Sequence, residues 1–198
     1  VVQSDLLANE PIVSESRDPR VAAAIDSPLV CDFGTDDHYR ALLVHGTRES
    51  GLRLAAAMDH EIEASNELRT RMHREDDLAR LTAAVDVPAG ERLRVTKYLA
   101  YGWSARRSVP SLRAQVEAAL TGAFRTGWEG FLAQQRSYLD RFWESADVQV
   151  EGHPQVQQAV RFALFHILQA TARGEKRPIS AKGLTGPGYE GHAFWEAE

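Results

Sequence analysis

The C-terminal part of the chain reads Lys182-Gly-Leu-Thr-Gly-Pro-Gly-Tyr-Glu-Gly-His-Ala-Phe-Trp-Glu-Ala-Glu198. Its four glycines, Gly183, Gly186, Gly188 and Gly191, indicate a backbone that bends tightly or lies close against another part of the molecule. Aromatic rings, an imidazole and carboxylates accompany these glycines. The apolar faces of a sugar pack on an indole, and ionised carboxylates accept hydrogen bonds from ring hydroxyls. The stretch is therefore a candidate for half of a sugar-binding site.

Two other interpretations apply to the same residues. The last three of these glycines satisfy the G-x-G-x-x-G pattern of dinucleotide-binding folds, which is informative only between a strand and a helix. Here the preceding element reads as a helix and Pro187 interrupts the pattern, so the sequence disfavours a nucleotide site. The residues by themselves leave a plainer alternative open. In that alternative, the segment is a glycine-rich surface loop whose Phe194 and Trp195 begin a core helix.

The stretch resembles the signature of the family 65 glycoside phosphorylases and hydrolases, whose run is similar to KGLTG-x-GY-x-GH-x-FWD-x-E. A looser likeness covers most of the chain and includes Ser4-Asp5-Leu6, Asp18-Pro19-Arg20, Trp143 and Val156-Gln157-Gln158-Ala159. The resemblance implies a carbohydrate-active enzyme that cleaves an α-glucosidic disaccharide such as trehalose, maltose or kojibiose. The signature positions that match are Lys182, Gly183, Leu184, Thr185, Gly186, Gly188, Tyr189, Gly191, His192, Phe194, Trp195 and Glu198.

The resemblance also implies roles for single residues. In the family, the Phe-Trp-Asp stretch lines the subsite of the non-reducing glucosyl unit, which makes Trp195 the implied platform and Glu196 the implied hydroxyl-binding carboxylate. The other substrate-binding candidates are Phe194, His192 and Tyr189. Lys182 is expected to fix the loop by bonding a carboxylate or a carbonyl. The implied loop framework is Lys182, Gly183, Gly186, Gly188, Gly191 and Glu198.

The sequence departs from the usual pattern at two positions, with Glu196 where Asp is typical and Ala197 where Thr is common. A Glu carboxylate lies one methylene further from the backbone, so its hydrogen bonds to a given pair of hydroxyls have a different geometry. A hydrogen bond to a charged group contributes about 1.5–3 kcal/mol. The identity of the sugar is therefore left open by these two positions.

Inverting cleavage of a glycosidic bond needs a carboxylic acid that protonates the leaving oxygen and a nucleophile on the opposite face of the sugar. In a phosphorylase inorganic phosphate is the nucleophile, as a co-substrate. In the family both the acid and the phosphate pocket come from segments beyond the signature. We therefore expect no catalytic residue, no cofactor and no turnover in this chain alone. A family 65 hydrolase that uses water, and a non-catalytic carbohydrate-binding or scaffold module, remain alternatives.

Composition excludes several other classes. The net charge of −5 is spread along the chain, and the short Arg106-Arg107 pair is too small for a nucleic-acid footprint. No apolar run is long enough to span a membrane, and no H-E-x-x-H pair suggests a metal site. Cys31 is the one cysteine, which fits a reducing compartment and predicts a small buried residue. The expected location is cytoplasmic, and the expected partners are a disaccharide, the remainder of a longer polypeptide and, by the resemblance, a second copy.

Residues 29–101 have the alternating pattern of strands, and several strands of this kind indicate an antiparallel sandwich. Strands are expected at 40–45 and 52–60 around a loop at 46–51, while the charge-rich run 69–80 predicts a solvated loop. A hairpin with one packed face is expected around the turn at 88–91. Its apolar positions are Ala79, Leu81, Ala83, Val85 and Val87, then Leu93, Val95, Leu99 and Tyr101, with Lys97 as an interruption.

From Pro110 the apolar spacing becomes helical. Three helices are expected, the third from Pro154 to about Arg173, apolar on nearly all sides and with His166 as a core histidine. The resemblance implies the late strands of an N-terminal β-sandwich at 1–105, a helical linker at 106–150, and the first helix of a catalytic (α/α)6 barrel at 151–198. The stripes of the first two helices are Leu112, Val116, Ala119 and Leu120, then Trp128, Phe131, Leu132, Leu139, Phe142 and Trp143.

Overall fold

The computed structural model of the protein describes residues 1–10, 18, 20, 27–171, 179–184, 189 and 192–193. The chain divides into two compact units. The first comprises Val1–Glu10 and Ser27–Glu129, and the second comprises Pro11–Asp26 and Gly130–Glu198.

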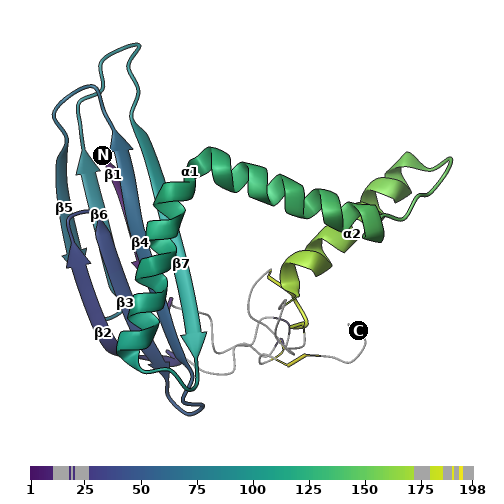
Figure 1. The fold of residues 1–198 in the computed structure, drawn as a ribbon, viewed down its shortest axis with the longest axis horizontal. Helices are drawn as coiled ribbons and strands as arrows, with labels where there is room; N and C mark the ends of the chain where they lie inside the picture. The colour runs from purple at the N-terminus through teal and green to yellow at the C-terminus, as the bar shows by residue number, and fades with distance from the viewer. Residues whose placement is uncertain are drawn as a thin grey trace. The chain divides into compact units, whose positions relative to one another are not determined.

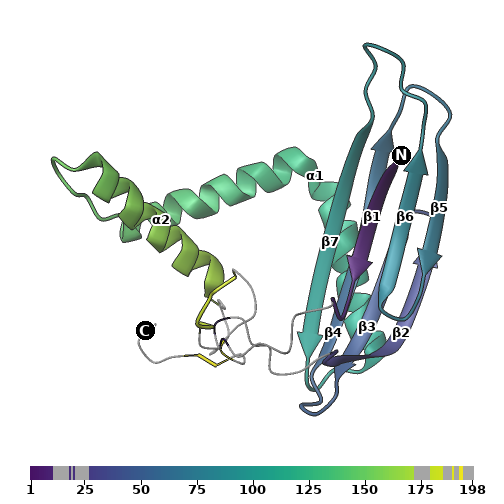
Figure 2. The ribbon, with the colours of Figure 1, turned by 180° about the vertical axis from the view of Figure 1, so that it is seen from behind.

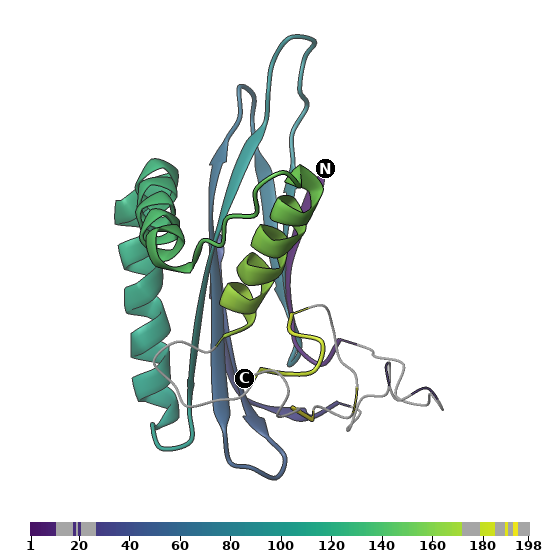
Figure 3. The same ribbon diagram turned by 90° about the vertical axis from the view of Figure 1, so that its right-hand side faces the viewer.

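The first unit contains two antiparallel sheets and the beginning of a long helix (Figure 1). The three-stranded sheet has the order β1 (Val2–Leu7), β6 (Leu78–Ala84), β5 (Arg69–Arg74). The four-stranded sheet has the order β2 (Leu29–Asp37), β3 (Arg40–Thr47), β4 (Arg53–Glu63), β7 (Arg94–Ser104). Figures 2 and 3 show the two sheets face to face, with the first part of α1 on the outer side of the four-stranded sheet. The expected antiparallel sandwich is confirmed.

Strand β3 lies in the middle of this unit and is buried on both faces. Because successive side chains of a strand point to opposite faces, Leu42 and Val44 face α1 while Leu43 faces the three-stranded sheet. The first face packs against Leu112 and Val116 of α1, and the apolar area that this buries is the main favourable term in holding the helix on the sheet. The second face packs with Leu6, Ala79 and Met58.

The expected hairpin around 88–91 is wrong, although its turn is present. The amide of Glu91 donates to the carbonyl of Pro88 at 3.0 Å, and Gly90 has φ +88°, which suits glycine. Strand β6 pairs with β1 and β5, however, whereas β7 pairs with β4. The connection therefore carries the chain from one sheet to the other, a step that alternation along the sequence does not distinguish from a hairpin.

The expected buried face of β7 is also wrong. Leu99 and Tyr101 are 45% and 61% exposed, whereas Tyr98 and Ala100 are buried. The helix covers the face that carries Tyr98, Ala100 and Gly102, and a β-carbon at Gly102 would lie 3.1 Å from a methyl group of Val116. Alanine and glycine allow this close approach, whereas the prediction gave more weight to the larger Leu99 and Tyr101 on the other face.

The charge-rich run 69–80 forms β5 and the start of β6, so the expected loop is wrong as well. The run is solvated, as expected, because β5 is an edge strand whose residues are exposed apart from the half-buried Met72. Charged side chains on an edge strand discourage pairing with other chains. Cys31 in β2 is half-buried, less than expected, and burial raises the pKa of its thiol.

Helix α1 (Val109–Ala146) begins at the expected place. The hydroxyl of Ser108 accepts a hydrogen bond from the amide of Ser111, and Pro110 lies in the first turn, where a proline is tolerated. Leu112, Val116 and Leu120 are buried as predicted, but Ala119 is exposed. At Gly127 the backbone leaves the helical region with φ 61° and ψ 178°, so the two expected helices are continuous except for this break.

In the second unit, helix α2 (Pro154–Ala170) matches the expected third helix with Pro154 at its start. The side chain of Gln157 bonds the amide of Val150 and the carbonyl of Val148, which fastens the preceding loop to the helix. Among the described residues of α2, Leu168 is buried, while Phe162 and Ile167 are more than half exposed. His166 is also exposed and lies edge-on to the ring of Phe162 at 4.3 Å, so the expected core position of this histidine is wrong.

Candidate functional site

A tight turn at residues 180–183 begins the candidate sugar-binding segment. The amide of Gly183 donates to the carbonyl of Ser180 at 2.9 Å, and the hydroxyl of Ser180 donates to the carbonyl of Gly183 at 2.8 Å. Gly183 has φ +56°, and a β-carbon there would lie 3.4 Å from that of Ala170. A residue with a side chain would be strained in this conformation, which explains the glycine after Lys182.

A second turn, from Tyr189 to His192, folds back on the first. The amide of His192 donates to the carbonyl of Tyr189 at 2.9 Å, and Tyr189 has φ 49°. The amide of Ala181 reaches the carbonyl of His192 at 3.4 Å. Tyr189 is half-buried and the side chain of His192 is exposed. The backbone therefore holds an exposed imidazole and a phenol beside the turn that carries Lys182.

A distant part of the chain contacts this turn through Lys182. Its ammonium group donates to the carbonyl oxygen of Arg20 at 3.0 Å, across 162 positions of sequence. Arg20 in turn bonds Asp18, with its amide at 3.0 Å and with three guanidinium contacts between 2.7 and 3.1 Å. Asp18, Arg20 and Lys182 form a connected set that we call the Asp18–Lys182 brace.

The charges of the brace reinforce one another. The guanidinium and the amide of Arg20 are the main reasons that the pKa of Asp18 falls to about 2, and the nearby Lys182 lowers it further. The same hydrogen bonds raise the pKa of Arg20, with a smaller electrostatic contribution from Tyr189. Asp18 therefore carries its full negative charge, and Arg20 its full positive charge, across the physiological pH range.

The structure brings together four of the predicted site residues, namely Lys182, Gly183, Tyr189 and His192. The other predicted residues lie outside the described part of the chain and keep the status of predictions: Gly186, Gly188, Gly191, Phe194, Trp195, Glu196 and Glu198. Sequence reasoning did not single out the brace as part of the site. The signal that could have indicated it is the Asp-x-Arg spacing, which suits a side chain that bonds the amide two residues later.

Among the described residues, no group of three or more histidine, cysteine or acidic side chains has the arrangement of a metal site. Across the same residues, no helix combines the length and apolar character needed to cross a membrane.

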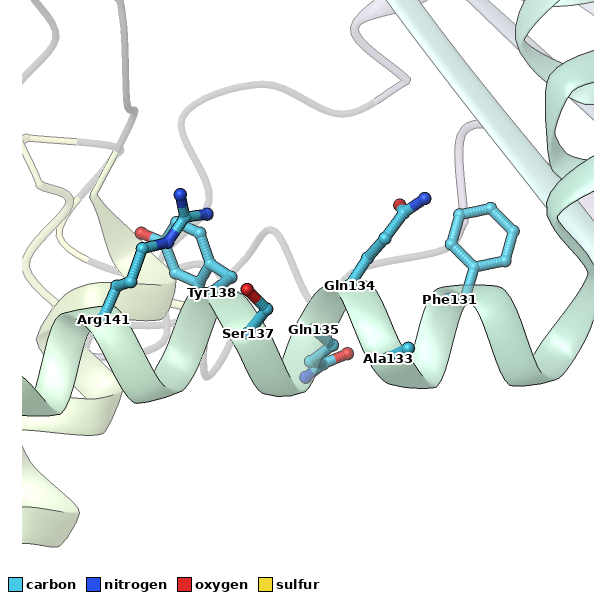
Figure 4. Close-up of a pocket in the computed structure, with 7 residues that line it drawn as sticks. All are labelled: Phe131, Ala133, Gln134, Gln135, Ser137, Tyr138 and Arg141. Atoms are coloured by element: carbon cyan, nitrogen blue, oxygen red, sulfur yellow. The ribbon is translucent and has the colours of Figure 1, made fainter.

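A concave surface lies along α1, at a place distinct in sequence from the predicted site. A shallow hollow of about 710 Å³ is lined by residues between 131 and 141, and Phe131, Gln134, Tyr138 and Arg141 project from the same side of the helix (Figure 4). All the described residues that line the hollow belong to α1, and together they form an open surface. A small-molecule site normally buries most of its ligand, and this surface alone does not.

Two family descriptions match the chain. Residues 1–142 match the glycosyl hydrolase family 65 N-terminal domain, and residues 161–198 match the glycosyl hydrolase family 65 central catalytic domain. An uncharacterised glycosyl hydrolase of Mycobacterium tuberculosis is 53% identical over 197 residues, which cover 100% of this chain and 25% of that protein. The α,α-trehalose phosphorylase of Thermoanaerobacter brockii is 29% identical over 187 residues, 94% of this chain and 24% of that protein.

Among solved structures, a putative kojibiose phosphorylase from the human microbiome superposes with a TM-score of 0.79 over 98% of this chain and 24% of its own. At 18% sequence identity, this similarity concerns the fold. The chain spans about a quarter of the length of the relatives that it matches. Since the N-terminal domain description alone covers residues 1–142 of 198, the chain belongs to glycosyl hydrolase family 65.

Proposed function

We propose that the whole protein cleaves an α-glucosidic disaccharide by phosphorolysis with inversion, and that residues 182–198 supply the loop that binds the glucosyl unit. One observation carries this proposal. The glycine- and aromatic-rich stretch lies inside the 161–198 match to the catalytic domain, in a family whose relatives include a protein named α,α-trehalose phosphorylase. The hydrogen bonds that connect the turn at 180–183 with His192 support it, because they hold Lys182, Tyr189 and His192 of the same stretch together.

In this proposal, Trp195 stacks on the apolar face of the glucosyl ring and Glu196 accepts hydrogen bonds from its hydroxyls. The exposed imidazole of His192 and the half-buried phenol of Tyr189 provide further polar contacts. The general acid and the phosphate pocket belong to segments of the whole protein outside residues 1–198, as the family resemblance implies. The isolated chain is therefore expected to be inactive.

The reaction has a defined balance of atoms. A phosphate oxygen forms a bond to the anomeric carbon on the face opposite the leaving group, while the general acid gives its proton to the departing glycosidic oxygen. An α-glucoside therefore yields β-glucose 1-phosphate and the released sugar. No redox step or organic cofactor is required.

The test uses the full-length protein with trehalose, kojibiose and maltose, each with and without inorganic phosphate. The proposal expects glucose 1-phosphate only when phosphate is present, and its β anomer is identified by the proton coupling of the anomeric position in NMR. Equal rates of glucose release with and without phosphate would instead identify a hydrolase that uses water. The name of the relative that is 53% identical, an uncharacterised glycosyl hydrolase, is compatible with either outcome.

A carbohydrate-binding or scaffold module is the second class of function to separate. Titration of the 1–198 chain with glucose, trehalose and maltose, followed by tryptophan fluorescence, distinguishes it from an enzyme segment. A subsite without its other walls should bind weakly. Tight saturable binding by the isolated chain, together with an inactive full-length protein, would favour the module.

A further inference from the structure

We propose that Asp18 and Arg20 are positioning residues for the glucosyl-binding loop, acting through Lys182. This inference rests on the proposed function, because it assigns the brace a part in substrate binding. It concerns residues more than 160 positions before the loop, and their side chains need not touch the sugar.

The first step of the argument is the rigidity of the Asp18–Arg20 turn. The carboxylate of Asp18 accepts from both the main-chain amide and the guanidinium of Arg20. Bidentate contacts between arginine and a carboxylate fix orientation as well as adding energy. The amide contact sets the backbone of the turn, and the guanidinium contacts stop the long side chain from moving. Together they restrain the position of Arg20, the residue whose carbonyl meets Lys182.

The second step is the transfer of that geometry to the loop. The carbonyl of Arg20 accepts from the ammonium group of Lys182 at 3.0 Å. Lys182 lies between Ala181, whose amide reaches the carbonyl of His192, and Gly183, whose amide closes the first turn. A shift of Lys182 would therefore disturb both turns of the candidate site. Lys182 and Gly183 are half-buried, whereas the neighbouring Ala181 is exposed.

The third step separates a positioning role from a purely stabilising one. Asp18 and Arg20 are 38% and 71% exposed, and ion pairs at such sites contribute little to overall stability. Small displacements of groups that contact a substrate, in contrast, can cost about a hundredfold in rate or affinity. Loss of the brace should therefore appear in substrate binding much more than in thermal stability.

The experiment uses the full-length protein with the variants Asp18→Asn and Lys182→Met. We expect each to raise the KM for the disaccharide by about 5- to 30-fold while kcat changes by less than about threefold. Lys182→Arg keeps a cationic donor and should recover most of the wild-type KM. The matched control is Asp5→Asn, since Asp5 forms a similar double contact with Arg80, at 2.7 and 2.6 Å, in the β-sandwich. It should leave KM within about twofold of the wild-type value.

Hydrogen exchange supplies a readout that does not depend on catalysis. In Asp18→Asn and Lys182→Met, the amides of Ala181, Gly183 and His192 should exchange faster than in wild type, with unchanged exchange in the sandwich. An unchanged KM in an active enzyme, or unchanged exchange, would overturn the inference. If the wild type cleaves no disaccharide, the proposed function fails first. In that case, faster amide exchange in the two variants would show that the contact of Lys182 with Arg20 has a structural role only. The proposed role in positioning the substrate-binding loop would then be rejected together with the proposed function.

Discussion

The imidazole of His60 in β4 bonds the hydroxyl of Ser4 in β1 at 2.8 Å, which joins the two sheets of the sandwich. The other ring nitrogen lies 2.8 Å from the carbonyl of Tyr39. A carbonyl only accepts, so Nδ1 carries the proton and Nε2 accepts from Ser4. Both nitrogens of the neutral ring are satisfied at a site that is 3% exposed. If Nε2 were also protonated, its N–H would have no hydrogen-bond acceptor unless the hydroxyl group of Ser4 reoriented.

Stability should therefore fall as the medium becomes acidic. Burial is the main cause that lowers the pKa of His60, and the positive charge of Lys97 lowers this pKa further. The hydrogen bond to the carbonyl of Tyr39 and the negative charge of Asp59 act in the opposite direction and only partly offset the decrease. In the unfolded chain the histidine titrates near its ordinary pKa of about 6.5. Below that pH the unfolded state binds a proton that the folded state does not, so the free energy of unfolding decreases.

Urea denaturation at pH 7.5 and 5.5 measures this effect. The wild type should lose more stability between the two pH values than His60→Gln, which cannot titrate. His38→Gln is the control for loss of an imidazole, because His38 lies in an exposed turn, where its ring contacts Asp37. Parallel losses in all three proteins would contradict the assignment.

Helix α1 should depend on a small number of fully buried residues. Leu112 is 0% exposed between the helix and the four-stranded sheet. Leu112→Ala is expected to lower the free energy of unfolding by about 2–5 kcal/mol, because it removes buried methyl groups and leaves a cavity. Leu99→Ala in the exposed face of β7 is the comparison and should change stability by about 0.5 kcal/mol or less in the isolated chain. Similar losses for the two variants, measured by denaturation, would show that the buried face has been misassigned.

The interruption of the helical conformation within α1 should depend on having a glycine at position 127. Its φ of 61° with ψ of 178° lies in a region that is essentially restricted to glycine, so Gly127→Ala should cost about 1–3 kcal/mol or straighten the helix. Gly122 lies in the regular part of the same helix, with no atom near the position of an added β-carbon. Gly122→Ala should therefore increase stability by about 0.5–1 kcal/mol. Opposite signs for the two variants in thermal unfolding are the expected result, and equal signs would argue against the break.

The sequence predicted the elements of this fold better than their partners. The apolar alternation at Ala79, Leu81 and Ala83 correctly identified a strand with one buried face. It could not show that β6 and β7 lie in different sheets, because strand pairing depends on long-range packing. The buried face of β7 was predicted wrongly because Ala100 and Gly102 are small, and their value lies in allowing the helix to approach closely.

The candidate site was predicted in a similarly partial way. Tight backbone geometry was expected at the glycines of the signature, and Gly183, which lies among the described residues, has the positive φ that fits this expectation. Lys182 bonds a carbonyl, which is one of the two partners expected for it, but the sequence did not indicate that Arg20 and Asp18 supply this contact. A carbonyl is present at every position of a sequence, so only the folded chain shows that the one at Arg20 faces Lys182.

For the activity of the full-length enzyme, the negative charge of the Glu196 side chain should matter more than the length of that side chain. If the carboxylate accepts hydrogen bonds from glucosyl hydroxyls, Glu196→Gln removes the charged acceptor, and each such bond contributes about 1.5–3 kcal/mol. We expect kcat/KM of the full-length enzyme to fall by about 10- to 100-fold in Glu196→Gln. Glu196→Asp restores the residue typical of the family and should stay within about tenfold of the wild type. Glu151→Gln, in the exposed turn before α2, is the control for loss of a carboxylate. Wild-type kinetics in Glu196→Gln on every active disaccharide would remove Glu196 from the glucosyl subsite.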